Sequence, residues 1–293
     1  MNKIVLSILF SLVAIGLKAQ PLAQRLDSLL MNDPMMRTSE VGISVFDLTT
    51  GESLFQYQDE KLYRPASTEK VVTSVSALGT LGTDYTMDTR LQYTGTIEND
   101  TLKGSLYLIG GFDPEFMDED LDSLVDIIAK SGIRYITDTL AADVSMTDSI
   151  YWGNGWSWDD VPASFQPYMS PLMLNRGCVD VTVIPAQKDS LPQVVCVPAS
   201  DYYQVDNDGV SNNPQAGRLQ ITRNWLHHGN LIHISGNVTK ETTRTLSIYN
   251  SKEFFFQTFV NRLKSKGVEM QHVAFADCPE NDSLTVVTPL FTL

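Results

Sequence analysis

The first third of the chain alternates between helical and strand-like spacing of its apolar residues. Residues 21–33, PLAQRLDSLLMND, repeat their apolar positions as one face of an amphipathic helix does. Residues 41–65 alternate apolar and polar positions on both sides of LTTGES, which predicts a β-hairpin with a glycine-containing turn. A second helix is predicted over residues 67–81, with Gly82 as its C-cap, because apolar residues recur there at Val71, Val72, Val75, Leu78 and Leu81.

The pattern changes near residue 85, where short strands separated by turns begin. Seven such segments are TRLQYTGTI, LKGSLYLIGG, DTLAADVSMTD, CVDVTVIPA, PQVVCVPAS, RLQITRNW and NLIHISGNV. Two helices interrupt them, DEDLDSLVDIIAKSG and SKEFFFQTFVNRLKSKGV, and the polar stretch at 201–217 is predicted to be a loop. The chain therefore has an α+β pattern, in which a long β-rich region follows the helix at 67–81.

The N-terminus carries a different signal. A short basic start, MNK, precedes the apolar run IVLSILFSLVAIGL, and Ala19 follows as a small residue suited to cleavage. This pattern predicts a signal peptide over residues 1–19 and an exported protein; the alternative is an N-terminal anchor helix. No later stretch of the sequence is apolar enough to span a membrane.

Charge and cysteine content narrow the function classes. Net charge is −14, and removal of Lys3 and Lys18 with the signal peptide makes it −16, which argues against nucleic acids and anionic lipids as partners. The three cysteines and four histidines have no spacing typical of a metal site. Cys178 and Cys196 flank a predicted hairpin, where a disulfide and two free thiols are both open alternatives.

The stretch RPASTEKVVTSVSALGTLG, residues 64–82, holds the candidate chemistry. Ser67 and Lys70 are three apart, so on a helix their side chains share a face. A serine hydroxyl needs a base within hydrogen-bond reach to act as a nucleophile, and a lysine that loses its proton can supply one. The first turn of a helix also offers free N–H groups to a developing oxyanion. The alternative is structural, with Ser67 as an N-cap and Lys70 as a solvated residue.

Three further segments, taken in order with this one, resemble a known family. They are LKGSLYLIGGFDPEF, GNGWSWDDVPASFQPYMSPLMLNRGCVDVTV and FFFQTFVNRLKSKGVEM. Together with RPASTEKVVTSVSALGTLGTDYTMDTRL they resemble the penicillin-recognising serine D-Ala-D-Ala carboxypeptidases. Within that family the likeness is to the low-molecular-mass class C type, which often doubles as a peptidoglycan endopeptidase. The resemblance runs from about residue 21 to residue 293.

The resemblance implies an architecture. A β-lactamase/transpeptidase-like catalytic domain, incomplete here, is interrupted by a β-rich inserted domain, and a further β domain is nested in the insertion. The implied ranges are 20–84 for the first part of the catalytic domain, 85–167 and 240–284 for the inserted domain, 168–239 for the nested domain and 285–293 for a truncated return to the catalytic domain.

The resemblance also implies the site and its ligands. Ser67 would be the acylated nucleophile, its backbone N–H half of the oxyanion hole, and Lys70 the general base. Asp160 would recognise the amino group of the diamino acid in a peptidoglycan stem peptide, with Phe165 as an apolar neighbour. β-Lactams would be covalent inhibitors, no cofactor or metal would be needed, and the location would be periplasmic or otherwise exported.

Two further local motifs bear on the choice between a binding site and a structural role. Trp156 and Trp158, beside Asp159 and Asp160, fit either a carbohydrate-binding aromatic platform or a packed domain junction. The GGFDP segment is not a phosphate-binding loop, because no lysine or helix follows it; we expect a turn in which Asp113 bonds nearby backbone.

Two motifs of the family are not found in their expected places. K-T-G is absent, and S-x-N occurs as Ser211-Asn212-Asn213, which we interpret as a decoy because Pro214 follows and the late helix comes after it. The chain ends at Leu293, about where the family enters the helix before S-x-N, so we expect the chain alone to be inactive or poorly folded. The competing hypotheses are a catalytically incomplete peptidoglycan-binding remnant and a β-lactam or ester hydrolase.

Overall fold

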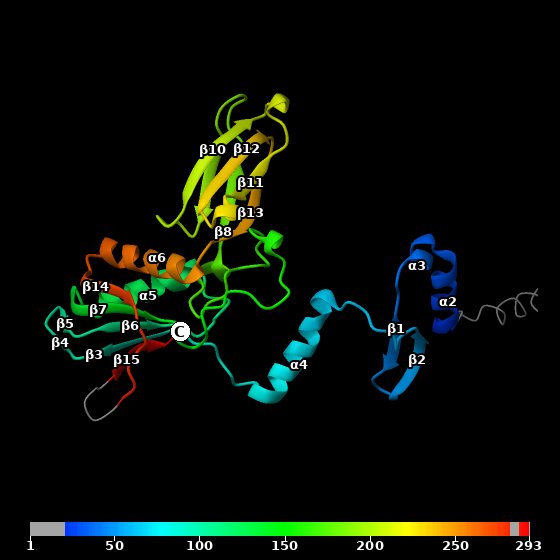
Figure 1. Cartoon of the computed structure of the whole chain (residues 1–293), viewed down its shortest axis with the longest axis horizontal. Helices are drawn as coiled ribbons and strands as arrows, with labels where there is room; N and C mark the ends of the chain where they lie inside the picture. Colours follow the sequence, from blue (N-terminus) through cyan, green and yellow to red (C-terminus); the bar gives the residue numbers. More distant parts are fainter. Residues whose placement is uncertain (1–20, 282–286, 293) are drawn as a thin grey trace, which may run out of the picture. The chain divides into compact units, whose positions relative to one another are not determined.

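A computed structural model describes residues 21–281 and 287–292, so the predicted signal peptide lies outside the described residues. The chain divides after Tyr85 into two compact units (Figure 1). The division falls where the sequence pattern changes from mixed helix and hairpin to short strands.

The first unit begins with helices and a hairpin. Its elements are α2 (Leu22–Asn32), α3 (Pro34–Thr38), β1 (Ile43–Asp47) and β2 (Glu52–Tyr57), which confirms the predicted amphipathic helix and hairpin. The Asp33 carboxylate caps α3 by accepting from the N–H groups of Met35 and Met36. Leu30 of α2 and Phe55 of β2 are the buried apolar side chains of this small assembly.

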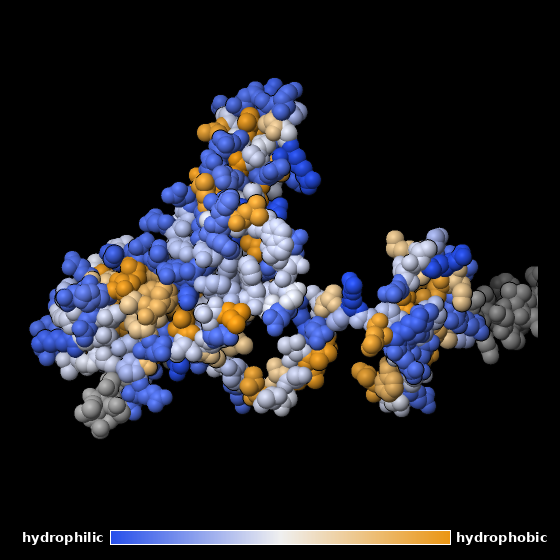
Figure 2. All heavy atoms as spheres, viewed as in Figure 1, coloured by the Kyte–Doolittle hydropathy of each residue, from blue (hydrophilic) through white to orange (hydrophobic). Residues whose placement is uncertain are grey.

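A long helix, α4 (Glu69–Leu81), completes the first unit. Its predicted C-cap is confirmed, since Gly82 has φ +83° and its N–H donates to the Leu78 carbonyl at 3.0 Å. The predicted apolar positions do form one stripe, and hydrophobic atoms are visible along the helix in Figure 2. Within the described residues, no side chain of α4 is buried. The five residues of the stripe are 49–66% exposed: Val71, Val72, Val75, Leu78 and Leu81.

The second unit is built on a seven-stranded sheet. Strand order is β15-β3-β6-β7-β5-β4, and β14 pairs with β7 in parallel. The strands are β3 (Arg90–Thr94), β4 (Thr96–Glu98), β5 (Thr101–Lys103), β6 (Leu106–Ile109), β7 (Tyr135–Asp143), β14 (Glu269–Phe275) and β15 (Val287–Thr292). The family resemblance implied that residues 285–293 return to the catalytic domain, and β15 within that range pairs with β3 of this sheet.

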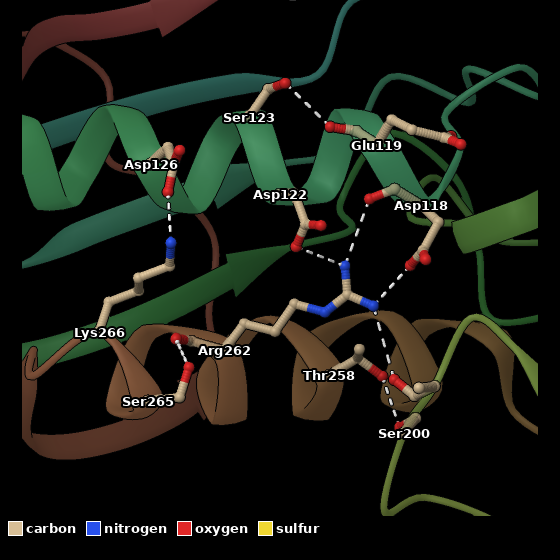
Figure 3. Close-up of polar contacts among 11 residues, drawn as sticks. Asp118, Glu119, Asp122, Ser123, Asp126, Ser200, Thr258, Arg262, Ser265 and Lys266 are labelled. Carbon is tan, nitrogen blue, oxygen red and sulfur yellow. Dashed lines mark hydrogen bonds and ion pairs between the residues drawn. The ribbon is translucent and has the colours of Figure 1, made fainter.

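Two helices pack against this sheet and contribute buried side chains to its hydrophobic core. They are α5 (Asp118–Lys130) and α6 (Ser251–Ser265), both predicted from their spacing. Leu121, Leu124 and Ile128 of α5 join Phe255 and Phe259 of α6 in one cluster with the buried strand residues. Arg262 of α6 links the two helices through the carboxylates of α5 (Figure 3).

Two three-stranded sheets lie within residues 178–247, a segment called here the nested β region. One has the order β13-β8-β9, from β8 (Cys178–Ile184), β9 (Gln193–Val197) and β13 (Thr242–Ser247). The other has the order β10-β12-β11, from β10 (Gln204–Ser211), β11 (Gln220–Arg223) and β12 (Leu231–Val238).

The prediction of a loop over residues 201–217 was wrong for part of that segment. Residues 204–211 form β10, which runs parallel to β12 with Gln204 opposite Leu231 and Ser211 opposite Val238. The segment has little apolar character of its own, and its backbone is paired because β12 supplies the regular, alternately buried partner.

Candidate functional site

Ser67 and Lys70 lie within hydrogen-bond distance at the start of α4. The Lys70 Nζ donates to the Ser67 Oγ across 2.9 Å. Both side chains are exposed within the described residues, and the contact follows from their three-residue spacing on the first helical turns. The pair therefore has the geometry in which a proton can pass between the serine oxygen and the lysine nitrogen.

The backbone before Ser67 has an unusual conformation. Ala66 has φ +45°, a left-handed value that alanine rarely adopts and that costs about 1–3 kcal/mol. Pro65 precedes it, and the short 3-10 helix η1 (Ala66–Thr68) then leads into α4. Strain of this kind is typical of functional sites, and nothing in the residue types of this stretch predicted it.

Ser67 does not act as the helix cap. The N-cap of α4 is Thr68, and no side chain makes a capping hydrogen bond there. The Thr68 hydroxyl donates instead to the Pro65 carbonyl, and its N–H bonds the same oxygen at 3.0 Å. The structural alternative for Ser67 was thus wrong in its capping part, since the hydroxyl is engaged by Lys70 rather than by backbone.

Asp160 and Phe165 lie in the second unit, on the long connection between β7 and β8. Asp160 ends the 3-10 helix η2 (Trp158–Asp160), and its side chain is partly buried. Among the described residues, no donor or cation is paired with its carboxylate. Phe165 is 72% exposed, a high value for a phenylalanine. The two residues together offer an unpaired anion and an accessible ring.

The same connection carries Trp156 and Trp158, for which the sequence allowed either a carbohydrate-binding platform or a packed domain junction. Trp158 is 65% exposed and its ring lies 5.4 Å, centroid to centroid, from that of Trp225 in the 3-10 helix η5 (Trp225–His227). Trp156 is also exposed. Trp158 thus combines a junction contact with an accessible face, so neither alternative for the cluster describes it alone.

Several candidate residues have structural roles. The Ser211 hydroxyl is fully buried and accepts from the Ala186 N–H at 3.0 Å, as expected if the S-x-N sequence there is a decoy. Asp113 accepts from the Glu115 N–H at 2.9 Å, which is the predicted turn. His233 contacts its cross-strand partner Asp206 at 3.0 Å, on the paired strands β12 and β10.

The cysteines are free thiols. Cys196 pairs with Val181 across β8 and β9, and Cys178 lies three residues before Val181. Because successive strand side chains point to opposite faces, Cys178 and Cys196 lie on opposite sides of the sheet. The alternative of a disulfide between them is therefore excluded.

Within residues 21–281 and 287–292, no group of three or more His, Cys, Asp or Glu side chains is placed to hold a metal ion. Nor is any helix in these ranges long and apolar enough to cross a membrane.

Comparison with protein families gives one match that covers nearly the whole chain. The model of the D-Ala-D-Ala carboxypeptidase 3 (S13) family matches residues 22–288. A D-alanyl-D-alanine carboxypeptidase of Actinomadura sp. (strain R39) is 29% identical over 204 residues, covering 68% of this chain and 38% of the relative. The D-alanyl-D-alanine carboxypeptidase DacB of Haemophilus influenzae is 24% identical over 237 residues, covering 79% of this chain and 49% of the relative.

Solved structures share the fold. Penicillin binding protein 4 (dacB) from Haemophilus influenzae superposes with a TM-score of 0.70 at 22% identity, covering 91% of this chain and 58% of that one. Its complex with a novel β-lactam superposes with a TM-score of 0.63 at 20% identity, covering 91% and 56%. The predicted α+β fold class with a β-rich insertion is confirmed. The chain spans between 38% and 58% of the lengths of these relatives.

Proposed function

Because the chain belongs to the D-Ala-D-Ala carboxypeptidase 3 (S13) family, we propose that the whole protein is a serine D-Ala-D-Ala carboxypeptidase/endopeptidase acting on peptidoglycan stem peptides. The observation that carries this proposal is the 2.9 Å contact between Lys70 Nζ and Ser67 Oγ, at a strained backbone turn that opens a helix. The family match spans residues 22–288, a range that includes this pair, and the contact between the two side chains supports their proposed roles.

The reaction follows from what these two groups do. Lys70, acting as the general base, takes the proton from the Ser67 hydroxyl as Oγ attacks the carbonyl carbon of the penultimate D-Ala. The negative charge that forms on the carbonyl oxygen is met by the Ser67 N–H and by the positive end of α4. The tetrahedral intermediate expels D-Ala, whose amine receives the proton, and leaves an ester on Ser67. Water then hydrolyses the ester and restores the hydroxyl.

Substrate recognition is assigned to the second unit. The Asp160 carboxylate is unpaired among the described residues and is suited to bind the ammonium group of the diamino acid in the stem peptide. Phe165, largely exposed, would contact the alkyl part of the same side chain. A β-lactam would acylate the same serine and remain as a covalent inhibitor, and no cofactor or metal takes part.

The proposed location is the periplasm or another exported compartment. Its support is the signal-peptide pattern of residues 1–19 and the nature of the proposed substrate, which lies outside the cytoplasmic membrane.

Release of D-Ala from a stem peptide ending in D-Ala-D-Ala tests the function. The full-length protein is expected to release it, and Ser67→Ala is expected to abolish release. Ser76→Ala is the matched control, because Ser76 is an exposed serine of the same helix without a lysine partner among the described residues. Release that persists in Ser67→Ala would show that the nucleophile is another group. Absence of release by the unsubstituted protein would refute the function itself.

A further inference from the structure

The loop that carries Asp160 and Phe165 is held by its own short hydrogen bonds. The Ala163 N–H donates to the Asp160 carbonyl at 2.8 Å. The Gln166 side-chain amide donates to the Ser157 carbonyl at 2.7 Å. These bonds shape the loop, but they are all internal to it, so other elements must fix its position.

The loop rests on the last residue of β13. The Ser247 N–H donates to the Pro162 carbonyl at 2.9 Å, and Ala163 forms an isolated bridge with Leu246. The Ser247 carbonyl in turn accepts from Arg223 Nε at 2.8 Å. The backbone of Ser247 is therefore hydrogen-bonded to two partners. Its carbonyl accepts from Arg223, and its N–H donates to Pro162, which lies two residues after Asp160 in the loop.

Arg223 is an unusual residue for such a place. It belongs to β11, its side chain is only 1% exposed, and no carboxylate forms an ion pair with it among the described residues. Its Nη1 donates to the Gly229 carbonyl at 2.7 Å. Burial lowers the pKa of its guanidinium, and contact with Tyr168 opposes that change. A buried cation is expensive to keep, so retaining one for bonds to two backbone carbonyls indicates a positional role.

The same guanidinium contacts the far end of the loop. It lies 5.9 Å from the ring centre of Tyr168, three residues after Phe165. Tyr168 is almost fully buried, and its ring packs against Trp152 at 4.9 Å and Tyr249 at 5.1 Å. Arg223 thereby reaches the loop at both Pro162 and Tyr168, the first through Ser247 and the second directly.

Trp225 adds a contact to the part of the loop that precedes Asp160. It follows Arg223 by two residues, and its ring contacts Trp158, which precedes Asp160 by two residues. One short segment of the nested β region, residues 223–225, is thus connected to the loop before Asp160, after Asp160 and after Phe165.

We propose that Arg223 and Trp225 are positioning residues through which the nested β region sets the recognition of the cationic side chain of the substrate. Arg223 fixes the backbone on which the Asp160 carboxylate and the Phe165 ring are carried, and Trp225 fixes the turn before them. This inference rests on the proposed function, because it assigns the support of the recognition loop rather than the chemistry at Ser67.

The test compares two peptides ending in D-Ala-D-Ala, one with a free amine on its diamino acid and one with that amine acetylated. The quantity measured on the full-length protein is the ratio of kcat/KM for the two peptides, together with the rate of acylation by a penicillin. Asp160→Asn is the reference variant and should abolish the preference for the free amine. Arg223→Met should lower the preference roughly tenfold, mainly through KM, because a small displacement of a binding group weakens its contact.

Several variants separate positioning from general damage. Arg223→Lys keeps a charge near Tyr168 but cannot bridge two carbonyls as a guanidinium does, so an intermediate preference is expected. Trp225→Ala, at a partly exposed ring, should give a smaller loss of the same kind and serves if Arg223→Met does not fold. Arg218→Met, an exposed arginine of the same region, is the matched control and should leave the preference unchanged.

The outcomes are distinct. Arg223→Met combined with Asp160→Asn should be no worse than Asp160→Asn alone, since the support acts through that carboxylate. The inference is overturned if Arg223→Met and Trp225→Ala leave the preference intact, or if they slow both peptides and penicillin acylation equally. If Asp160→Asn itself keeps the preference, the proposed recognition role of Asp160 fails, and the inference fails with it.

Discussion

At the scale of single residues, the pair Ser67 and Lys70 is where sequence and structure agree most closely. The three-residue spacing predicted that the side chains could meet, and the two atoms are 2.9 Å apart. What the residue types did not predict is the left-handed Ala66 before the serine, because alanine carries no sign of such a backbone. Nor did they predict that Arg223 is buried, since its contacts come from segments far apart in the sequence.

The role of Lys70 as a base predicts a specific effect of a charge-conserving substitution. Lys70→Arg keeps a cation beside Ser67, but the guanidinium stays protonated and cannot accept the serine proton. Penicillin acylation of the full-length protein should fall by roughly 10²–10⁴-fold. The rate of acylation, followed with a fluorescent penicillin, checks this. Acylation of the Lys70→Arg variant at the normal rate would show that positive charge alone is required.

Cys178 gives a prediction on pH. Burial, with Asp180 as a lesser cause, raises the pKa of its thiol from 9.0 to about 12. The thiol is therefore neutral in the fold but ionises near pH 9 when unfolded, so its contribution to stability is complete below pH 9 and is lost as the pH rises toward 12. Between pH ~8 and ~10 the chain should lose about 1.4 kcal/mol more unfolding free energy than Cys178→Ala does.

Urea unfolding followed by tryptophan fluorescence measures this difference. All four tryptophans lie after Tyr85, so their emission reports the second unit alone. Equal losses in Cys178→Ala and the parent chain would contradict a buried neutral thiol at this position.

At the scale of elements, periodicity predicted those elements whose apolar residues recur regularly along one face. The helices α2, α5 and α6 and the β1–β2 hairpin follow directly from apolar spacing. Periodicity did not predict β10, because its own residues are mostly polar and its strand conformation depends on pairing with β12. For α4 the spacing predicted the stripe of five apolar residues but not its exposure, because burial depends on which elements pack against it.

The link between α5 and α6 gives a prediction at the element scale. Arg262 is 18% exposed, and its guanidinium contacts Asp118 at 2.5 Å and Asp122 at 2.9 Å (Figure 3). Arg262→Met should lower the unfolding free energy of the second unit by about 1–2 kcal/mol, because a partly buried, two-partner contact is lost. The same fluorescence-detected urea unfolding measures it.

Lys266→Met is the control for this prediction. Lys266 follows the last residue of α6 and contacts Asp126 of α5 at 2.8 Å, but its side chain is 50% exposed. Solvent screening should keep its effect below about 1 kcal/mol. Equal effects of the two substitutions would show that burial does not strengthen the Arg262 contact.

At the scale of the whole molecule, the proposed activity draws on both units. The nucleophile and base lie before Tyr85, and the proposed recognition loop lies after it. The sequence pattern placed the change of architecture near residue 85, because the spacing of apolar residues switches there from helix to short strands. Which segments of the β-rich region support the loop depends on contacts such as Arg223 to Ser247, and these no local pattern can predict.

The proposed mechanism requires that Ser67 is the residue acylated by substrates and by β-lactams. The most direct measurement is to incubate the full-length protein with a penicillin, digest it, and locate the covalent adduct by mass spectrometry. We expect the adduct on Ser67, its absence in Ser67→Ala and its retention in Ser76→Ala. An adduct on any other residue, or labelling that survives Ser67→Ala, would contradict it.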